Sequence, residues 1–333
     1  MTAKKRICSP EDFKVYLETH SDALLHRNGA CRQCSYKNRC GESIKWNLNH
    51  RLSKKPPTTE NRIRQCFCRI LPGAFLRPLF VKEFLPCSHT AIEILEEKEE
   101  IFRLLRTLDH KSAEALVCLL MYRITGDDAY TSAADCKEEQ YFIEPFRNLT
   151  GEEVVVDCGA FTGDTLEAYI KNNAPPKRYY LYETKAEYIA EIQAAIKRLS
   201  AEQYAVVRAK GVWSHPARLW FSPGKHGGAG GGFVSETKGA NSEPVDVVSL
   251  DADISGPVSF IKMDIEGAEV DALLGADRLI RSFKPRLAIC IYHRTTDLWR
   301  IPLSLIDRYP FYENVIIRHH KHHSVGDTVL YLF

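Results

Sequence analysis

The segment Val154–Thr165, with the sequence VVVDCGAFTGDT, limits the fold of this chain more than any other. Three consecutive valines are typical of a short, fully buried β-strand, and Asp157 stands at its end. Gly159 and Gly163 then allow a tight turn, and the residues TLEAYIK that follow favour a helix. Backbone N–H groups at such a helix N-terminus bind nucleotide-like ligands. The segment therefore predicts an α/β fold with a ligand site at the turn.

The spacing within this turn distinguishes between two nucleotide cofactors. The fingerprint of dinucleotide dehydrogenases is Gly-x-Gly-x-x-Gly, whereas this turn reads Asp-x-Gly-x-x-x-Gly. A carboxylate there is unfavourable beside the pyrophosphate of NAD, but it suits the positively charged amino group of S-adenosylmethionine (SAM). Glu183 ends the next strand-like run, RYYLYE, at a distance suited to ribose hydroxyls. We therefore predict that SAM is bound by Asp157, Gly159, Ala160, Phe161, Gly163, Asp164, Thr165 and Glu183.

A second strand–acid–helix pattern occurs in Ser259–Ile280, SFIKMDIEGAEVDALLGADRLI. Its apolar strand ends at Asp264, and Glu266 follows two residues later. We expect one amphipathic helix after them, whose apolar face carries Val270, Leu273, Leu274 and Ile280. The later run KPRLAICIYHR predicts another buried strand, which ends at His293. The ends of parallel strands meet at one edge of a sheet, where ligands bind, so these polar residues are site candidates.

These residues resemble the FkbM family of SAM-dependent methyltransferases. The motifs that carry the resemblance are the DCGAFTGDT turn, the VSLD segment ending at Asp251, KMDIEGAE and the later KP-strand-YH. One departure is Thr184, because the family usually has proline after the acid at Glu183. The resemblance implies a SAM-dependent methyltransferase domain over residues 141–333. It also implies a doubly wound, Rossmann-like class I sheet that ends in an antiparallel hairpin.

Methyl transfer from a sulfonium is an in-line displacement, and a hydroxyl acceptor also needs a base near its oxygen. His293 is our first candidate for this base because its ordinary pKa is about 6.5. Asp264 is the second candidate, Glu266 completes the catalytic set, and a structural histidine that caps the strand is the alternative for His293. Either carboxylate can instead hold a divalent cation, which lowers the pKa of the acceptor hydroxyl. We expect Lys262 and Glu266 to form an internal ion pair near the site.

The composition fits a folded enzyme without a membrane-spanning segment. The 333 residues exceed one typical domain, and 45 basic residues nearly balance 43 acidic ones. No run of about 18 apolar residues is present, so no membrane-spanning segment is predicted. Lys4, Lys5 and Arg6 are not followed by the apolar stretch of a signal peptide. We therefore expect a cytoplasmic protein whose eleven cysteines are thiols or metal ligands and not disulfides.

Residues 1–88 differ from the rest and are predicted to form a basic, cysteine-rich region. Residues 1–82 contain 17 Lys or Arg but only 6 Asp or Glu, and seven of the eleven cysteines precede residue 88. The cluster Cys31-x2-Cys34-x5-Cys40 offers three thiolates to a zinc ion or an iron–sulfur cluster. Its spacing partly resembles the cluster-binding segment of SPASM-type domains, and three unligated thiols are the alternative. Candidates for a fourth ligand are Cys8, Cys66, Cys68, His26 and His50.

Residues 89–140 are predicted to be a helical segment that packs on the catalytic domain. Apolar residues recur at helical spacing between His89 and Asp109, which predicts one helix. A second helix is expected over residues 112–125, with its end at Gly126. The segment is expected to contribute to the core, and a wall of the acceptor site is the further role that we consider for it.

Three later segments are expected to form an excursion from the main sheet, a loop and a terminal hairpin. The RLWF-loop-VVSL stretch is predicted to leave the main sheet between its third and fourth parallel strands. Its tract Gly224–Gly232 lacks the features of a phosphate loop, so we expect a mobile loop. NVIIRHH and DTVLYLF are expected to form the terminal antiparallel hairpin. The tract His319–His323 then spans its turn and needs no metal ion.

Three functions compete for this sequence. The resemblance favours an O-methyltransferase that acts on a hydroxyl of a sugar, a glycan or a small metabolite. A nucleic-acid methyltransferase is the second, because the basic N-terminal region interleaves Lys and Arg with Tyr36, Trp46 and Phe67, as an RNA-stacking surface requires. The third is a SAM-binding scaffold or metal-dependent interaction module without catalysis. The basic region also fits a solvated face that docks on an anionic surface.

Overall fold

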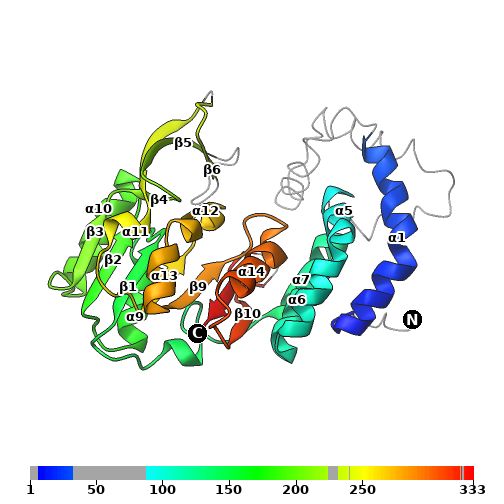
Figure 1. Cartoon of the computed structure of the whole chain (residues 1–333), viewed down its shortest axis with the longest axis horizontal. Helices are drawn as coiled ribbons and strands as arrows, with labels where there is room; N and C mark the ends of the chain where they lie inside the picture. The colour runs from blue at the N-terminus through cyan, green and yellow to red at the C-terminus, as the bar shows by residue number, and fades with distance from the viewer. Residues whose placement is uncertain (1–6, 33–87, 224–231, 240, 323, 325) are drawn as a thin grey trace, which may run out of the picture. The chain divides into compact units, whose positions relative to one another are not determined.

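The computed structural model of the chain describes residues 7–32, 88–223, 232–239, 241–322, 324 and 326–333. Its contacts divide the chain into two compact units, and Figure 1 labels many of their helices and strands. The first unit comprises residues 1–135 and 321–325, and the second comprises residues 136–320 and 326–333. The domain boundaries that we predicted after residues 88 and 140 remain predictions.

The first unit is helical in its described part. Its helices are α1 (Pro10–Arg32), α5 (Ser88–Glu96), α6 (Lys98–Thr107), α7 (His110–Thr125) and α8 (Asp128–Ala134). The stretch predicted as one helix is divided at Glu97 into α5 and α6, whereas α7 ends before Gly126 as predicted. Asp109 caps α7 because its side chain accepts a hydrogen bond from the Ser112 amide. Gly126 ends α7 with a φ of 71°, a left-handed conformation that favours glycine.

A seven-stranded sheet forms the centre of the second unit, in the order β10-β11-β9-β8-β1-β2-β3. Its parallel strands are β1 (Val154–Cys158), β2 (Arg178–Tyr182), β3 (Ala205–Arg208), β8 (Phe260–Met263) and β9 (Arg286–Cys290). The antiparallel pair at one edge is β10 (Val315–His319) and β11 (Thr328–Leu332). This mostly parallel sheet confirms the predicted Rossmann-like α/β class, and the edge pair confirms the predicted terminal hairpin.

Helices precede the first strand of this sheet and connect the later ones. They are η1 (Glu144–Phe146), α9 (Asp164–Asn172), α10 (Ala186–Arg198), α11 (Leu250–Asp253), α12 (Glu269–Leu274), α13 (Asp277–Phe283) and α14 (Asp297–Arg308). The prediction of one helix after β8 is wrong, because Gly275 separates α12 from α13 and the backbone of Trp213 packs there, 2.1 Å from where a Cβ would lie. Its predicted apolar face is divided into buried Leu273 and Ile280 and exposed Val270 and Leu274. None of the described helices is both long and apolar enough to cross a membrane.

A second, four-stranded sheet lies between β3 and β8 in the chain. Its strands are β4 (Gly211–Val212), β5 (Ala217–Pro223), β6 (Gly232–Ser235) and β7 (Glu243–Val248), in the order β4-β7-β5-β6. This sheet confirms the predicted excursion between the third and fourth parallel strands. Residues 224–231, which include most of the glycine-rich tract, lie outside the described residues.

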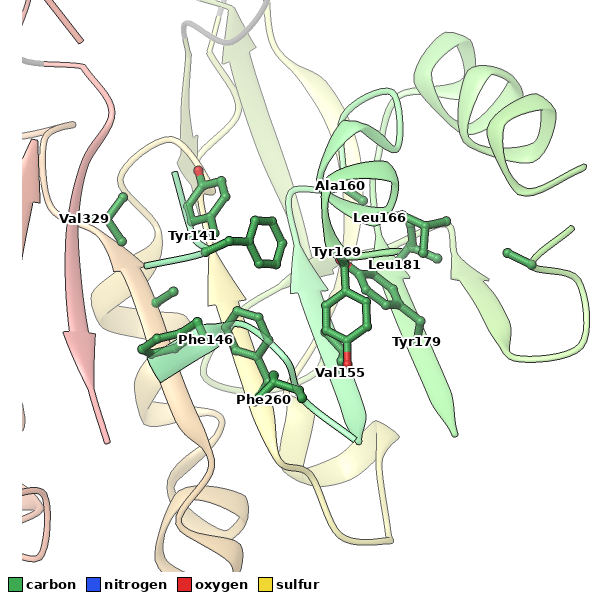
Figure 2. Packing of buried hydrophobic residues seen from close by; sticks show 14 of the residues in the cluster. Tyr141, Phe146, Val155, Ala160, Leu166, Tyr169, Tyr179, Leu181, Phe260 and Val329 are labelled. Atoms are coloured by element: carbon green, nitrogen blue, oxygen red, sulfur yellow. The ribbon is translucent and has the colours of Figure 1, made fainter. Parts of the chain in front are cut away.

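Aromatic side chains form much of the core of the second unit (Figure 2). Phe146 of η1 packs edge-on against Phe260 of β8, with 5.3 Å between ring centroids, and against Tyr331 of β11 at 5.1 Å. Tyr169 of α9 packs in the same manner against Tyr179 of β2 at 5.5 Å. Such pairs contribute about 0.5–1.5 kcal/mol beyond the burial of their area. Since all five side chains are buried, these contacts fix the strands whose ends carry the site.

The histidine tract spans the end of β10 and the turn after it, as predicted. His319 is fully buried, and its Nδ1 lies 3.0 Å from the Thr328 hydroxyl. The Nε2 atom of His320 lies 2.9 Å from the Tyr331 hydroxyl. His323 lies outside the described residues. These contacts give the first two histidines of the tract a structural role.

The predicted cysteine cluster lies almost wholly outside the described residues. Helix α1 includes the backbone of Cys31, whereas Cys34 and Cys40 follow its end and are not described. Three of the candidate fourth ligands, Cys66, Cys68 and His50, fall in the same part of the chain. The zinc or iron–sulfur site therefore stays a prediction.

Candidate active site

The candidate site lies where β1, β8 and β9 end, at the carboxyl edge of three neighbouring strands. Gly159 follows β1 in the left-handed conformation, with a φ of 80°. A Cβ at this position would lie 2.0 Å from the Asp264 carbonyl oxygen, so glycine alone lets the turn approach the end of β8 this closely. The amides of Gly159 and Ala160 both donate to the Tyr182 carbonyl at 3.0 Å, which ties the turn to β2.

The rest of the turn leads into α9. Phe161 has a φ of 46°, which is unusual for a residue with a side chain, and its ring is 37% exposed. Gly163 has a φ of 84° and precedes the first residue of α9, Asp164. The Asp164 carboxylate accepts a hydrogen bond from the amide of Thr165, whose side chain is buried. Phe161 is thus the turn residue that presents an apolar surface.

Asp157 lies beneath the turn and is fully buried. It is the register partner of Lys262 on β8, and the Lys262 ammonium lies 3.0 Å from its carboxylate. Lys262 also donates a hydrogen bond to the Gly159 carbonyl at 2.7 Å. Burial opposes its charge, but Asp157 and Asp264 raise the pKa of Lys262, so it is protonated. The predicted ion pair of Lys262 with Glu266 is wrong, because Lys262 instead forms its ion pair with Asp157 on the neighbouring strand β1.

Glu183 follows β2 and faces the turn. Its Oε2 accepts a hydrogen bond from the Phe161 amide at 3.1 Å. Its Oε1 accepts hydrogen bonds from the amides of Thr184 at 2.7 Å and Lys185 at 3.0 Å. A carboxylate has about four acceptor positions. Glu183 therefore keeps acceptor capacity on Oε2 for one hydroxyl group.

Asp264 is the centre of a hydrogen-bond network at the end of β8. The Tyr292 hydroxyl donates to its Oδ1 and the Tyr141 hydroxyl donates to its Oδ2, both at 2.9 Å. Burial opposes ionisation, but Lys262, His293 and the two hydroxyls lower the pKa of Asp264. The carboxylate is therefore charged at neutral pH, and its side chain keeps 23% exposure at the sheet edge.

His293 lies among three carboxylates. Its Nδ1 is 3.0 Å from Glu269 Oε1, and its Nε2 is 3.3 Å from Asp264 Oδ1 and 3.7 Å from Glu266 Oε2. Glu269 is 1% exposed and also accepts a hydrogen bond from the Ile265 amide at 2.9 Å. Burial opposes protonation, but the hydrogen bond and charge of Glu269, with the other two carboxylates, raise the pKa of His293 to about 9. At neutral pH the ring is therefore an imidazolium.

Glu266 stands in the turn between β8 and α12. Its φ of 60° is left-handed, and Gly267 follows with a φ of 92°. The Glu266 side chain is 32% exposed, in contrast to the buried Glu269. Burial, together with the charges of Asp264 and Glu269, outweighs the opposing effect of His293 and raises the pKa of Glu266 to about 7. Glu266 is thus an accessible carboxyl group that exchanges its proton near neutral pH.

The same side chains include a possible ligand set for a metal ion. Asp264, Glu269 and His293 offer ligand atoms that all lie within 4.8 Å of one another. Carboxylates and imidazole are ordinary ligands of divalent cations. The two ring nitrogens of His293 lie 3.0 Å from Glu269 and 3.3 Å from Asp264, distances at which an imidazolium forms ion pairs with the carboxylates.

The structure brings the three catalytic candidates from the sequence, Asp264, Glu266 and His293, into one cluster. It adds Glu269, Tyr141 and Tyr292, which the sequence reasoning missed. Two of these had a local signal, since Glu269 belongs to the KMDIEGAE motif and Tyr292 precedes His293. Tyr141 had none, because it lies 123 residues before Asp264 in the chain.

A mostly parallel sheet with a glycine turn after one strand and acids at the ends of adjacent strands defines a Rossmann-like nucleotide-binding domain. Residues 157–325 match the family model described as the methyltransferase FkbM domain. The chain therefore belongs to the FkbM methyltransferase domain family, as the sequence resemblance implied. None of the curated proteins matches it.

Solved structures include one with clear similarity to this chain. The methyltransferase FkbM from Methylobacillus flagellatus KT is 26% identical, with a TM-score of 0.60 over 73% of this chain and 60% of that one. This chain thus spans less than two thirds of that protein. An rRNA methylase from Streptococcus thermophilus is 13% identical, with a TM-score of 0.36 over 55% of this chain and 87% of that one. Fibrillarin from Aeropyrum pernix, solved with bound S-adenosyl-L-methionine, is 11% identical, with a TM-score of 0.36 over 58% of this chain and 71% of that one.

Proposed function

We propose that this protein is a SAM-dependent methyltransferase that methylates a hydroxyl group of a sugar, a glycan or a small metabolite. The observation that carries the proposal is the excess of carboxylates beside the Gly159 turn. Asp264, Glu266 and Glu269 surround a single imidazolium, so the strand ends are net negative. SAM carries positive charge on its sulfonium and its amino group, and a negative site attracts such a ligand. Membership of the FkbM family supports the same activity.

Three features of the chain suit SAM. The acceptor capacity left on Glu183 Oε2 serves a ribose hydroxyl, and the lack of a side chain at Gly159 lets the backbone approach the ligand. The amino group goes to Asp264, which is charged and partly exposed. Asp157 is instead a positioning residue in this proposal, because its carboxylate is fully buried and holds Lys262, which in turn holds the Gly159 carbonyl.

Glu266 is the proposed general base. SAM, when bound, supplies the methyl group, and the electron pair of the breaking carbon–sulfur bond stays on sulfur. The acceptor oxygen forms the new bond to carbon, and its proton passes to the Glu266 carboxylate. A pKa near 7 and a partly exposed side chain suit Glu266 for this role. His293 is less suited, because its ring already carries both protons at neutral pH, and we assign it the role of holding the carboxylates together.

Apolar side chains are exposed on the turn after β1 and on α12, and we take them as support for a sugar or small-metabolite acceptor. Phe161 is 37% exposed on the turn after β1. Val270 and Leu274 of α12, the helix that follows Glu266, are 42% and 45% exposed. Small-molecule sites combine apolar surface with a few polar groups that set orientation. Apolar faces of this kind can pack against a ring while Glu266 contacts one of its hydroxyls.

The proposal is tested by transfer of isotope-labelled methyl from SAM into a fractionated extract of the organism that encodes the chain. Wild-type protein and Glu266→Gln are compared, and binding of SAM to both is measured separately by calorimetry. Label that survives nuclease and follows glycans or small metabolites supports the proposal. Label that becomes acid-soluble after nuclease overturns it in favour of a nucleic-acid substrate. SAM binding without labelling of any fraction overturns catalysis and leaves a SAM-binding scaffold.

A further inference from the structure

Two thiols of the first unit meet although they lie far apart in the sequence. Cys8 precedes α1 and Cys118 lies within α7, and their Sγ atoms are 3.3 Å apart. Neither cysteine is part of a disulfide in this structure. Cys118 is 2% exposed, whereas Cys8 is only half-buried. One sulfur of the pair is therefore open to reagents, and the other is protected but in contact with it.

The start of α1 is held in place without any help from the thiols. The Asp12 amide donates to the Ser9 hydroxyl oxygen at 3.1 Å, which caps the helix one residue after Cys8. Phe13 is fully buried, and its ring packs edge-on against Phe102 of α6 at 6.4 Å between centroids. The cap and the apolar contact therefore set the position of the Cys8 sulfur before any bond forms.

We propose that Cys8 and Cys118 form a reversible disulfide that joins the segment before α1 to α7. A disulfide has a sulfur–sulfur distance of about 2.05 Å, so the two atoms need to approach by only about 1.3 Å. The two residues are 110 positions apart, and cross-linking restricts the unfolded chain more as the closed loop becomes longer. The bond therefore stabilises the docking of α1 in the first unit. This inference is independent of the proposed methyl transfer.

The described cysteines of the second unit have different surroundings and provide internal references. Cys158 and Cys290 are fully buried in β1 and β9, and burial raises the pKa of both thiols. Cys136 is half-buried, and its sulfur lies 3.8 Å from the Glu138 carboxylate. Cys136 therefore reports whether an oxidant reaches a half-exposed thiol, while Cys158 and Cys290 report whether the fold is intact.

Oxidised glutathione is a suitable oxidant, and the exchange balances in two steps. The Cys8 thiolate attacks one glutathione sulfur, the glutathione disulfide breaks, and one glutathione leaves as a thiolate. The Cys118 thiol then loses its proton to solvent, and its sulfur attacks the Cys8 sulfur and displaces the second glutathione. Two protein thiols lose two electrons, and one glutathione disulfide becomes two thiols. The predicted reduced state of the cysteines applies where the glutathione pool is reduced.

The test equilibrates the full-length protein with mixtures of oxidised and reduced glutathione and blocks the remaining thiols under denaturing conditions. Trypsin then releases Ile7–Lys14 and Ser112–Arg123, and mass spectrometry measures the peptide in which Cys8 joins them. We expect the linked peptide to account for most of Cys8 at the most oxidising mixture and to disappear on reduction. Recovery of Cys8 as its glutathione adduct with Cys118 blocked overturns the proposal, as does a link from Cys8 to any other cysteine.

Matched variants separate the bond from nonspecific oxidation. Cys118→Ser is expected to abolish the linked peptide and leave Cys8 joined to glutathione, whereas Cys136→Ser is expected to leave the linked peptide unchanged. Cys8→Ser provides a second variant at a less buried position, in case Cys118→Ser disturbs the packing of α7. Circular dichroism checks that each variant is folded. The proposal requires equal yields of the linked peptide in Cys136→Ser and wild type, and no linked peptide in Cys8→Ser.

Discussion

Replacing Glu269 by glutamine keeps the shape of the side chain and removes one of the three negative charges around His293. Glu269 is the nearest of the three carboxylates, at 3.0 Å against 3.3 Å for Asp264 and 3.7 Å for Glu266. The three together raise the pKa of His293 to about 9, which is about 2.5 units above its ordinary value. Loss of the nearest charge removes at least a third of that rise. We therefore expect the pKa of His293 to fall by about 0.8 unit or more, equivalent to about 1.1 kcal/mol.

The assay is an NMR titration of histidine-labelled protein, with the His293 signal assigned by its absence in His293→Gln. Asp264, Glu266 and, from α14, Asp297 still act on the ring in Glu269→Gln, so its pKa stays above the ordinary value. The loss of activity at alkaline pH, where the imidazolium deprotonates, should move to lower pH by the same amount. A His293 pKa within about 0.3 unit of wild type, in a folded variant, would refute the assigned pairing.

Four other predictions test the site. Glu266→Gln should lower kcat about 100-fold without weakening SAM binding. In the wild-type protein, kcat/KM for methyl transfer should rise with pH through about 7 as Glu266 ionises. A kcat/KM that does not change with pH in this range contradicts the assignment of Glu266 as the base. Gly159→Ala should raise the calorimetric Kd for SAM at least about tenfold, whereas Gly256→Ala, with open space for its Cβ, should not. Lys262→Met should lower the free energy of unfolding in urea by about 3–5 kcal/mol, because it leaves the buried Asp157 without its ion-pair partner. Adding Asp157→Asn to the same chain should restore most of the lost stability. Dialysis against a chelator should leave the methyl-transfer rate unchanged, and recovery only on adding a divalent cation would favour a metal at the cluster instead.

The sequence was sufficient to predict the sheet and the edge at which the site lies. An apolar run followed by an acid and a glycine marks both the end of a strand and the start of a turn, and this pattern occurs at Asp157 and at Asp264. Parallel strands bring such ends to one edge. The catalytic candidates Asp264, Glu266 and His293 therefore lie together as expected. The break at Gly275 was not predicted, because a glycine within a helical pattern does not by itself end a helix, and the Trp213 carbonyl that packs there comes from another part of the chain.

The partners of each side chain could not be predicted, because they depend on register between strands. Asp157 pairs with Lys262 only since β1 and β8 align these two residues. A shift of one residue would turn the lysine to the opposite face of the sheet. Tyr141 reaches Asp264 from a segment with no local pattern that indicates a role. Such pairings are decided by the packing of the whole unit.

The choice of base shows why the missing pairings matter for mechanism. Considered by its residue type, His293 has the ordinary pKa that suits a base at neutral pH. The buried carboxylate of Glu269 reverses this, because it stabilises the imidazolium at 3.0 Å. Burial and the same crowding of negative charge also raise the pKa of Glu266, to about 7, which is the range that suits a base at neutral pH. One buried acid, at the first residue of α12, thus moves the proposed role of base from the histidine to the neighbouring glutamate.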